Sequence, residues 1–147
     1  LVELAKRKGV NIVFPSDSVN ASAFDNNAEI NISSIGAIPN GFMGLDIGKS
    51  SILNFSKIIS TSKTIIWNGP MGVFEMSNFE KGTKEIATAI CKATEIGAYS
   101  LVGGGDSVAA IKKFRLEEKV SYLSTGGGAM LEYLKEEGLP GIEAILS

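Results

Sequence analysis

Three segments of the 147-residue sequence combine a short aliphatic run with glycines and the start of a predicted helix. They are YSLVGGGDS at 99–107, VSYLSTGGG at 120–128 and TIIWNGPMGVFE at 64–75. The N-terminus of a helix leaves backbone N–H groups unpaired, and glycines let an anion approach them closely. Repeated strand–glycine–helix units are typical of an α/β sheet that binds phosphate groups. The spacing therefore predicts a nucleotide site.

The first glycine triplet, Gly103 to Gly105, is followed directly by an aspartate and a serine. Without Cβ atoms, these glycines let backbone N–H groups come within hydrogen-bond distance of phosphate oxygens. Asp106 stands at the predicted helix start, where two roles are open. It either caps the helix, which is worth about 1 kcal/mol, or faces a hydrated Mg²⁺ carried by a nucleotide. A lone carboxylate suits the second role but cannot build a metal cage.

The second triplet, Gly126 to Gly128, follows Ser124 and Thr125 and carries no charge. It offers N–H groups and hydroxyls to an anion, and the N-terminus of the next helix adds partial positive charge. Such a site can stabilise the charge that develops during phosphoryl transfer without exchanging a proton. A tight turn that serves close packing is the structural alternative, and the sequence leaves both open.

The third segment places Asn68 before a Gly-Pro turn and ends on an apolar pair and a carboxylate. Glu75 is a candidate to accept hydrogen bonds from ribose hydroxyls, and Phe74 is a candidate wall for an adenine pocket. In the structural alternative, Phe74 belongs to the core and Glu75 caps a helix that begins near 77–80. Without the other two segments, the structural alternative is slightly favoured.

The sequence excludes several other chemistries. It has no His, which excludes a Ser-His-Asp triad, a Cys-His dyad and a His-ligated zinc site. The dinucleotide fingerprint fails in both triplets, because Val108 and Leu131 stand where its last glycine belongs. GLDIGKS at 44–50 resembles a P-loop, but its glycines are one residue too close. With a net charge of −2 and no basic stripe, no nucleic-acid or membrane partner is expected.

Strand and helix patterns alternate along the rest of the chain with short connections. Residues 1–9 are typical of the last turns of a helix, 10–15 of a short strand, and 16–43 of an irregular stretch with at most one hairpin. The other predicted elements are a helix after Gly48, helices at 79–96, 106–114 and 127–137, strands at 64–67, 98–102 and 120–123, and a turn at 138–141 before an aliphatic end. Right-handed crossovers place all glycine loops at one carboxyl edge. We expect one α/β domain with an open, mostly parallel sheet.

The ends and the single cysteine lead to further expectations. The sequence begins in the middle of a predicted helix, so we expect it to start partway into a larger protein. If the first strands of the sheet are missing, an apolar edge becomes exposed and the chain dimerises or aggregates. Cys91 falls in the apolar pattern of a helix, which favours a core thiol in a reduced compartment. No apolar run of 18 residues and no leader composition is found, so a cytoplasmic protein is expected.

Several strings, in this order, resemble the C-terminal half of phosphoglycerate kinases. They are WNGPMGVFE at 67–75, VGGGDS at 102–107 and STGGGA at 124–129, and they are supported by FDNN at 24–27, GLD at 44–46 and LPGIEAIL at 139–146. Each triplet alone is a weak signal, but together the strings are specific and cover almost the whole sequence. The resemblance implies that residues 1–147 are part of the C-terminal nucleotide-binding domain of a two-domain kinase, without its N-terminal triose-binding domain. It also implies a Rossmann-like, three-layer α/β/α fold with a mostly parallel sheet, of which this domain is incomplete.

The resemblance also implies an activity and a set of site residues. The family transfers a phosphoryl group reversibly between 1,3-bisphosphoglycerate and Mg-ADP, giving 3-phosphoglycerate and Mg-ATP in glycolysis. The motifs imply adenine contacts from Gly44, Leu45, Gly69, Met71 and Phe74, a ribose contact from Glu75, nucleotide-phosphate contacts from Asn68, Gly104, Gly105 and Ser107, a Mg²⁺ role for Asp106, and catalytic roles for Gly105, Gly127 and Gly128. The family more often has Thr where Ser107 stands, which retains a hydroxyl.

The same resemblance indicates what the sequence lacks. The family's basic triose-binding domain is not in it, nor is the glycine-and-lysine segment that supplies catalytic lysines. Those groups supply much of the positive charge that stabilises the transferred phosphoryl. We therefore expect the 147 residues alone to lack kinase activity. The complete protein is expected to be a monomer that binds ADP or ATP and the triose substrate.

Overall fold

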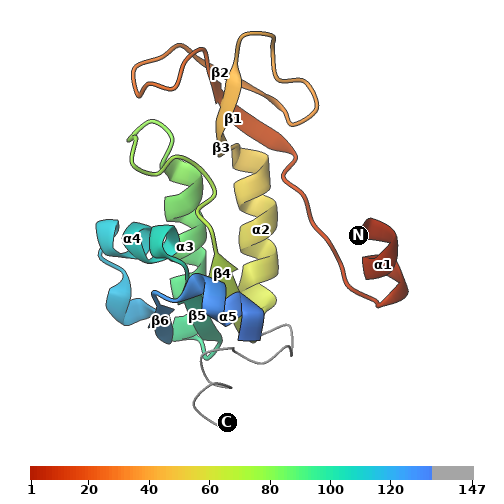
Figure 1. The fold of residues 1–147 in the computed structure, drawn as a ribbon, viewed down its shortest axis with the longest axis vertical. Helices are drawn as coiled ribbons and strands as arrows, with labels where there is room; N and C mark the ends of the chain where they lie inside the picture. Colours follow the sequence, from red (N-terminus) through yellow and green to blue (C-terminus); the bar gives the residue numbers. More distant parts are fainter. Residues whose placement is uncertain (134–147) are drawn as a thin grey trace, which may run out of the picture.

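The computed structural model describes residues 1–133, which form two small sheets with helices beside them (Figure 1). The helices are α1 (Val2–Arg7), α2 (Lys49–Thr61), α3 (Lys81–Glu95), α4 (Gly105–Lys113) and α5 (Gly127–Tyr133), with a 3-10 turn at Glu117–Lys119. The strands are β1 (Asp17–Ala21), β2 (Ile30–Ser34), β3 (Met43–Ile47), β4 (Thr64–Asn68), β5 (Tyr99–Gly103) and β6 (Tyr122–Ser124). The expected turn at 138–141, the aliphatic end and the last residues of the helix at 127–137 lie outside the described residues.

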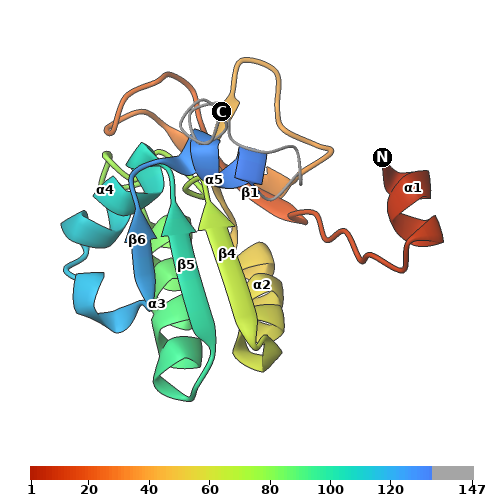
Figure 2. The ribbon, with the colours of Figure 1, turned by 60° about the horizontal axis from the view of Figure 1, so that its bottom comes forward.

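The three strands that precede the glycine segments form a parallel sheet in the order β4, β5, β6, as the sequence predicted. Alternate residues of these strands, among them Ile65, Trp67 and Val102, are buried in the main core. α2 and α3 lie against each other on the face where these residues are buried (Figure 2). α3 fits this face because its apolar residues recur at helical spacing; they are Ile86, Ala87, Ile90, Cys91 and Ala93. The burial of Cys91 confirms the predicted core thiol.

The expected three-layer arrangement around one mostly parallel sheet is only partly present. The opposite face of the parallel sheet carries Ile66, Tyr99 and Tyr122, each of which is about half exposed. The described residues therefore leave much of this face open to solvent. The remaining strands form a separate antiparallel sheet in the order β2, β1, β3. An α/β fragment with one parallel and one antiparallel sheet replaces the single mostly parallel sheet of the prediction.

The antiparallel sheet lies within residues 16–47, most of which were expected to form an irregular stretch. Its hairpin of β1 and β2 was foreseen only as a single short hairpin, and its pairing with β3 was missed. The strand expected at 10–15 is not formed. Its apolar residues, including Val10 and Phe14, are exposed and have no neighbouring strand among the described residues. A strand needs a hydrogen-bonded partner, so the aliphatic composition of this segment alone does not make it one.

Asp17 of β1 joins the antiparallel sheet to the first turn of α2. Its carboxylate accepts hydrogen bonds from the backbone N–H groups of Ser50 and Ser51 at 2.9 and 2.8 Å. A carboxylate here caps the helix from another strand, which compensates for the lack of a side-chain cap at Gly48. Although burial acts to raise the pKa of Asp17, the hydrogen bonds from Ser51 and Ser50 prevail and lower it.

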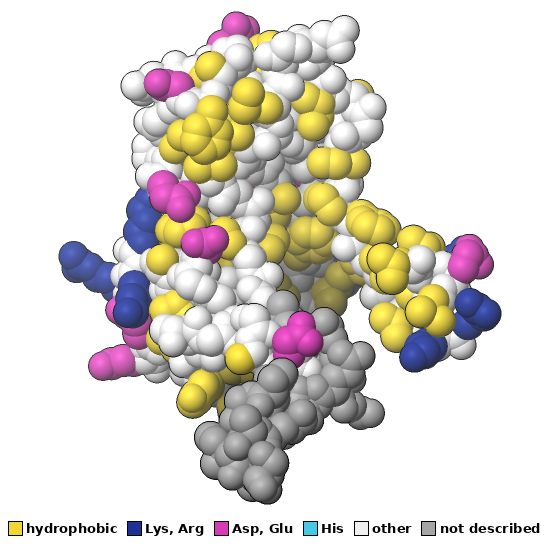
Figure 3. Space-filling view, viewed as in Figure 1, with side chains coloured by type: hydrophobic (Ala, Val, Ile, Leu, Met, Phe, Trp, Pro, Cys, Tyr) yellow, Lys and Arg dark blue, Asp and Glu magenta, His cyan; other side chains and the backbone are white. Residues whose placement is uncertain are grey.

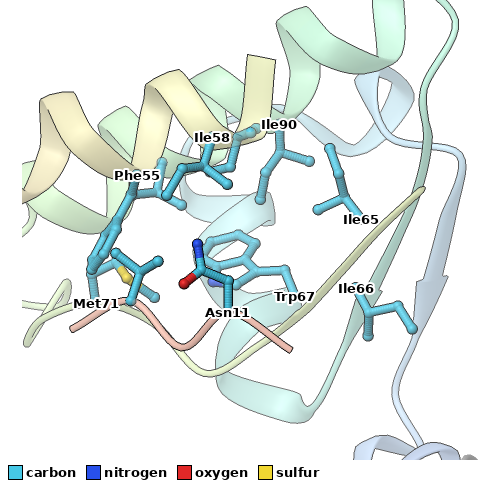
Figure 4. A pocket seen from close by; sticks show the side chains of 11 residues that line it. Asn11, Phe55, Ile58, Ile65, Ile66, Trp67, Met71 and Ile90 are labelled. Carbon is cyan, nitrogen blue, oxygen red and sulfur yellow. The ribbon is translucent and has the colours of Figure 1, made fainter. Parts of the chain in front are cut away.

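An apolar groove runs along the outer edge of β4, which has no partner strand among the described residues. The groove has a volume of about 360 Å³ and is lined by α2, β4, part of α3 and the extended segment near residue 11 (Figures 3 and 4). Trp67 lies at its base with Phe55, Ile58 and Ile90 around it (Figure 4). The indole Nε1 of Trp67 is buried without a hydrogen-bond partner. The exposed apolar edge expected from the sequence is therefore present, while self-association through it stays a prediction.

Candidate nucleotide-binding site

The three glycine segments meet at one edge of the molecule because their strands are parallel and in register. Asn68, the last residue of β4, lies opposite Gly103 of β5, and Gly103 lies opposite Ser124 of β6. The loops that follow these strands are therefore neighbours at the carboxyl edge of the sheet, which Figure 2 shows at the arrowheads. This confirms the predicted common edge. In open α/β sheets, this edge is where ligands bind.

Close packing explains some of the glycines in the two triplets. A Cβ atom on Gly127 would lie 2.4 Å from the Cα of Gly104, and one on Gly103 would collide with Met130. Gly104 itself has a φ of +90°, and a Cβ there would lie 2.6 Å from Oδ1 of Asn68. The structural alternative that the sequence left open, a tight turn for close packing, is therefore sufficient at Gly104 and Gly127, whereas at Gly103 only the flexible end of the Met130 side chain would have to move.

Gly105 and Gly128 differ, because a Cβ atom at either position would meet no atom within 4 Å. Neither has a positive φ, so neither steric crowding nor backbone conformation requires glycine there. Both lie in the first turn of a helix, where backbone N–H groups have no partner within the helix. The two residues leave open backbone at positions where an anion can approach.

Asp106 is exposed in the first turn of α4, beside these open glycines. No cluster of three or more His, Cys, Asp or Glu side chains that could hold a metal occurs within residues 1–133. A lone carboxylate can meet a Mg²⁺ that is held mainly by nucleotide phosphates.

The loop between β4 and α3 is held from inside through its own N–H groups. Gly69 N–H donates to Oγ of Ser107 at 2.7 Å, and Val73 N–H donates to the carbonyl of Leu45 at 2.8 Å. The N–H groups of Met71 and Gly72 both donate to Oγ1 of Thr83. The remaining residue of this run, Pro70, has no N–H. The loop therefore has no free N–H between 69 and 73, so it contacts a ligand through side chains, carbonyls or Cα atoms.

Three of the predicted adenine contacts, Gly44, Leu45 and Met71, line one pocket of about 450 Å³. The pocket lies between β3 and the loop at 70–73, and Ile35 and Ile38 close another side of it. Its mixture of apolar side chains and backbone suits a flat heterocycle better than a phosphate.

Asp46 of β3 lines the same pocket as a buried carboxylate that is only 5% exposed. It accepts hydrogen bonds from the N–H groups of Gly82 at 2.7 Å and Ile47 at 2.8 Å. Burial raises the pKa of Asp46 to about 6 despite these two hydrogen bonds, because they replace only part of its hydration. The hydrogen bond from Gly82 to Asp46 connects the first turn of α3 to β3.

The last two residues of the third segment separate in the structure. Phe74 is 5% exposed and packs in the main core, in line with the structural alternative that the sequence left open for it. Glu75 is exposed, and α3 begins at Lys81 without a side-chain cap, so Glu75 does not cap that helix. Lys113 of α4 donates to the carbonyl of Phe74 and pairs with Glu80 at 2.6 Å, which fixes this end of the loop.

Asp46 and Thr83 were not singled out from the sequence, although both hold the loop in place. A weak signal existed for Asp46, since a carboxylate between Leu45 and Ile47 in an apolar run is unusual. Thr83 gave none, because a threonine in the first turn of a predicted helix is ordinary. The hydroxyl of Ser107, expected to face phosphates, is buried and accepts the N–H of Gly69.

A comparison with known proteins identifies the family to which these loops belong. A family model described as phosphoglycerate kinase matches residues 1–137. The chain belongs to the phosphoglycerate kinase family. Similar members include the phosphoglycerate kinase of Porphyromonas gingivalis, 54% identical over 145 residues that cover 99% of this chain and 35% of that protein. The cytosolic phosphoglycerate kinase of Triticum aestivum is 50% identical over 145 residues, again 99% of this chain and 36% of that protein.

Solved structures agree with the family assignment. The phosphoglycerate kinase of Coxiella burnetii superposes with a TM-score of 0.86 at 41% identity, covering 97% of this chain and 35% of that one. The enzyme of Pyrococcus horikoshii gives a TM-score of 0.76 at 31% identity, covering 99% and 39%. The chain thus spans about a third of the length of the phosphoglycerate kinases that it matches. No helix within the described residues is both long and apolar enough to cross a membrane.

Proposed function

We propose that the chain is part of the C-terminal, nucleotide-binding domain of a phosphoglycerate kinase and binds Mg-ADP and Mg-ATP. The ligand lies at the carboxyl edge of β4, β5 and β6. In the complete enzyme, this edge takes part in reversible phosphoryl transfer between 1,3-bisphosphoglycerate and ADP, giving 3-phosphoglycerate and ATP in glycolysis. The triose binds to an N-terminal domain of the same cytoplasmic, monomeric protein.

The observation that carries this proposal is the open backbone at Gly105 and Gly128. Crowding and backbone conformation account for Gly104 and Gly127, but they give no reason for glycine at positions 105 and 128. An alanine in the first turn of a helix is more stable than a glycine by roughly 0.5–1 kcal/mol, so glycine here costs stability. Close approach of a phosphate to the backbone explains why glycine is present there despite the lower stability.

The described geometry supports a division of roles among the proposed site residues. Gly44, Leu45 and Met71 contact the adenine, because they line one mixed pocket. Glu75, exposed at the end of the loop, accepts hydrogen bonds from the ribose. Gly69 and Phe74 contribute through the shape of this loop, since the N–H of Gly69 and the ring of Phe74 both face inward.

The phosphate end of the nucleotide lies over the two glycine triplets. Gly105 binds nucleotide phosphates together with Gly104 and Asn68, whose side chain lies against Gly104. Ser107 supports them by fixing the loop that carries Gly69. The migrating phosphoryl lies near Gly105, Gly127 and Gly128, of which Gly105 and Gly128 offer open backbone and Gly127 sets the close packing.

Mg²⁺ enters with the nucleotide and neutralises charge on the phosphate oxygens when bound. Asp106, exposed in the first turn of α4, faces it as the single protein carboxylate. The carboxylate orients the metal-bound nucleotide and takes no part in proton transfer.

The 147-residue chain alone is proposed to bind nucleotide without catalysing transfer. The segments at 68–75, 103–107 and 124–128 contain no Lys or Arg. Phosphoryl transfer depends mainly on positioning and on positive charge around the transferred group. Backbone N–H groups supply partial charge only, so the full cationic charge must come from outside these loops.

Calorimetric titration of the chain with ADP in the presence of Mg²⁺ tests the proposal. We expect saturable heat for one site, and competition by ATP at the same site. No heat and no competition would overturn the proposal in favour of a purely structural fragment. A non-catalytic nucleotide-binding module would also give heat. The gene sequence upstream separates the two, because the kinase requires a glycine-and-lysine segment and an Arg-rich preceding domain.

A further inference from the structure

Thr83, in the first turn of α3, is completely buried and makes two contacts that leave its own helix. Its Oγ1 accepts hydrogen bonds from the backbone N–H groups of Met71 and Gly72, each at 3.1 Å. These residues lie in the first part of the loop between β4 and α3. A single hydroxyl therefore pairs two successive backbone donors of a loop that has no regular secondary structure.

The loop residues on either side of this pair are held by other groups. Gly69 donates to Ser107 of α4, and Val73 donates to the carbonyl of Leu45 in β3. Between these two anchors, Pro70 has no N–H, so Met71 and Gly72 are the only other backbone donors. Thr83 consequently supplies the hydrogen bonds that hold residues 70–72 against α3.

The space around Gly72 shows how closely the loop is seated. A Cβ atom on Gly72 would lie 2.4 Å from Oδ1 of Asp46 and 2.7 Å from the carbonyl of Leu45. The loop backbone thus lies directly against β3, which carries two of the proposed adenine contacts. A small displacement at Met71 and Gly72 changes the width of the pocket that these elements share.

We infer that Thr83 is a positioning residue for nucleotide binding: its hydroxyl holds Met71 and Gly72 in the conformation that shapes the adenine side of the site. The inference rests on the proposed function. Thr83 does not touch the nucleotide in this account, and it acts only through the loop.

Replacing the hydroxyl by a methyl group removes the acceptor while keeping the size and β-branching of the side chain. In Thr83→Val, two half-buried N–H groups lose their partner and gain more from water when the loop opens. Nucleotide then binds only to the fraction of molecules in which the loop is closed, and the apparent Kd rises in inverse proportion to that fraction. A loop closed in one molecule out of ten weakens binding about tenfold.

The experiment compares three variants of the full chain. Thr83→Val removes the acceptor, Thr83→Ser restores it, and Thr88→Val is the control on the same helix. Thr88 bonds only to the carbonyl of Lys84 within α3 and does not touch the loop. Two quantities are measured: the Kd for Mg-ADP by calorimetry, and the hydrogen exchange of the Met71 and Gly72 amides without nucleotide.

We expect Thr83→Val to weaken Mg-ADP binding about tenfold and to speed exchange at Met71 and Gly72, while Thr83→Ser and Thr88→Val behave as the wild type. Wild-type affinity together with faster exchange in Thr83→Val would overturn the positioning role. Equal exchange in Thr83→Val and the wild type would overturn the contact itself.

If Thr83→Val does not fold, the wild type still decides: Met71 and Gly72 must exchange at least about a hundredfold more slowly than unstructured amides, and unprotected amides would overturn the inference. If the wild type binds no nucleotide, the proposed function fails, while the exchange measurement still tests the contact.

Discussion

Asp46 makes the stability of the chain depend on pH in the range where carboxylates are normally ionised. Its carboxyl is 5% exposed and burial raises its pKa from 3.8 to about 6. As the pH rises from 4, the unfolded chain loses this proton first, whereas the folded chain keeps it until about pH 6. Rising pH therefore favours the unfolded state, and the stabilisation from the protonated carboxyl is lost between pH 4 and about 6.5.

The size of this loss follows from the pKa difference. A pKa raised by about two units corresponds to about 3 kcal/mol of unfolding free energy, at 1.36 kcal/mol for each unit. This is a substantial part of the total stability of a small domain, which is of the order of 5–15 kcal/mol. The lowered pKa of Asp17 acts in the opposite direction, because its stabilising effect is lost only as the pH falls through its lowered value.

Asp46→Asn removes the titration, because an amide has the shape of a carboxyl and carries no charge. Its NH2 group replaces an oxygen that accepts the N–H of Gly82 or Ile47, and the loss of that hydrogen bond lowers stability equally at every pH. From pH 4 to pH 7.5 we expect the stability of the variant relative to the wild type to rise by about 3 kcal/mol, since only the wild type gains a desolvated charge. Urea unfolding followed by the fluorescence of Trp67, the single tryptophan and 5% exposed, measures the difference directly.

The reasoning would be refuted by a stability difference between Asp46→Asn and the wild type that stays constant from pH 4 to pH 7.5. It would be refuted equally if the carboxyl carbon of Asp46 titrated in the folded chain with a midpoint at or below 4. Either result would show that the two hydrogen bonds from Gly82 and Ile47 offset the effect of burial in full.

Three other predictions follow from the same structure. Gly105→Ala adds a methyl group in open space, so it should raise stability by roughly 0.5–1 kcal/mol yet weaken Mg-ADP binding at least about tenfold, through loss of one charge-assisted hydrogen bond. Gly97→Ala, at a φ of +101° on the far side of the sheet, should lose about 1–2 kcal/mol of stability and keep its affinity; equal affinities of the two variants in calorimetry would contradict the site. A coupled ATP-forming assay should detect no turnover by the chain alone, and turnover would show that its loops suffice. Sedimentation should detect self-association of the chain, and Ile58→Lys, in the groove beside β4, should reduce it. A monomer in sedimentation that also unfolds sharply on heating would exclude self-association.

The parallel strands and the glycine edge were predictable because their signals are local. An aliphatic run that ends in glycines, followed by helical periodicity, defines β4, β5 and β6 within a few residues of where they lie. The glycine at 97 likewise marks the end of α3, since a φ of +101° is costly for other residues. The shared edge then follows from the handedness of the crossovers.

The strand expected at 10–15 and the missed pairing of β1 with β3 both depend on which segments become neighbours. Val10 to Phe14 has the composition of a strand but no partner among the described residues, whereas β1 pairs on both sides although its sequence, DSVNA, is polar. Composition reports the preference of a segment and not the presence of its partner.

The residues that shape the proposed site were not predictable for a similar reason. Asp46 and Thr83 act through burial and through backbone donors contributed by a distant loop. Such contacts exist only once the fold has brought β3, α3 and the loop together. The two glycine triplets, in contrast, were recognised as a unit, but only the structure divides them into glycines required by packing and glycines with open backbone.

Residue-resolved NMR of the ¹⁵N-labelled chain, titrated with Mg-ATP, tests the central claim most directly. We expect saturable shifts of the amides of Gly105, Asp106 and Gly128 at the carboxyl edge, with Gly97 on the opposite side unchanged. Shifts confined to the apolar groove beside β4, or no shifts at saturating Mg-ATP, would contradict the proposed site.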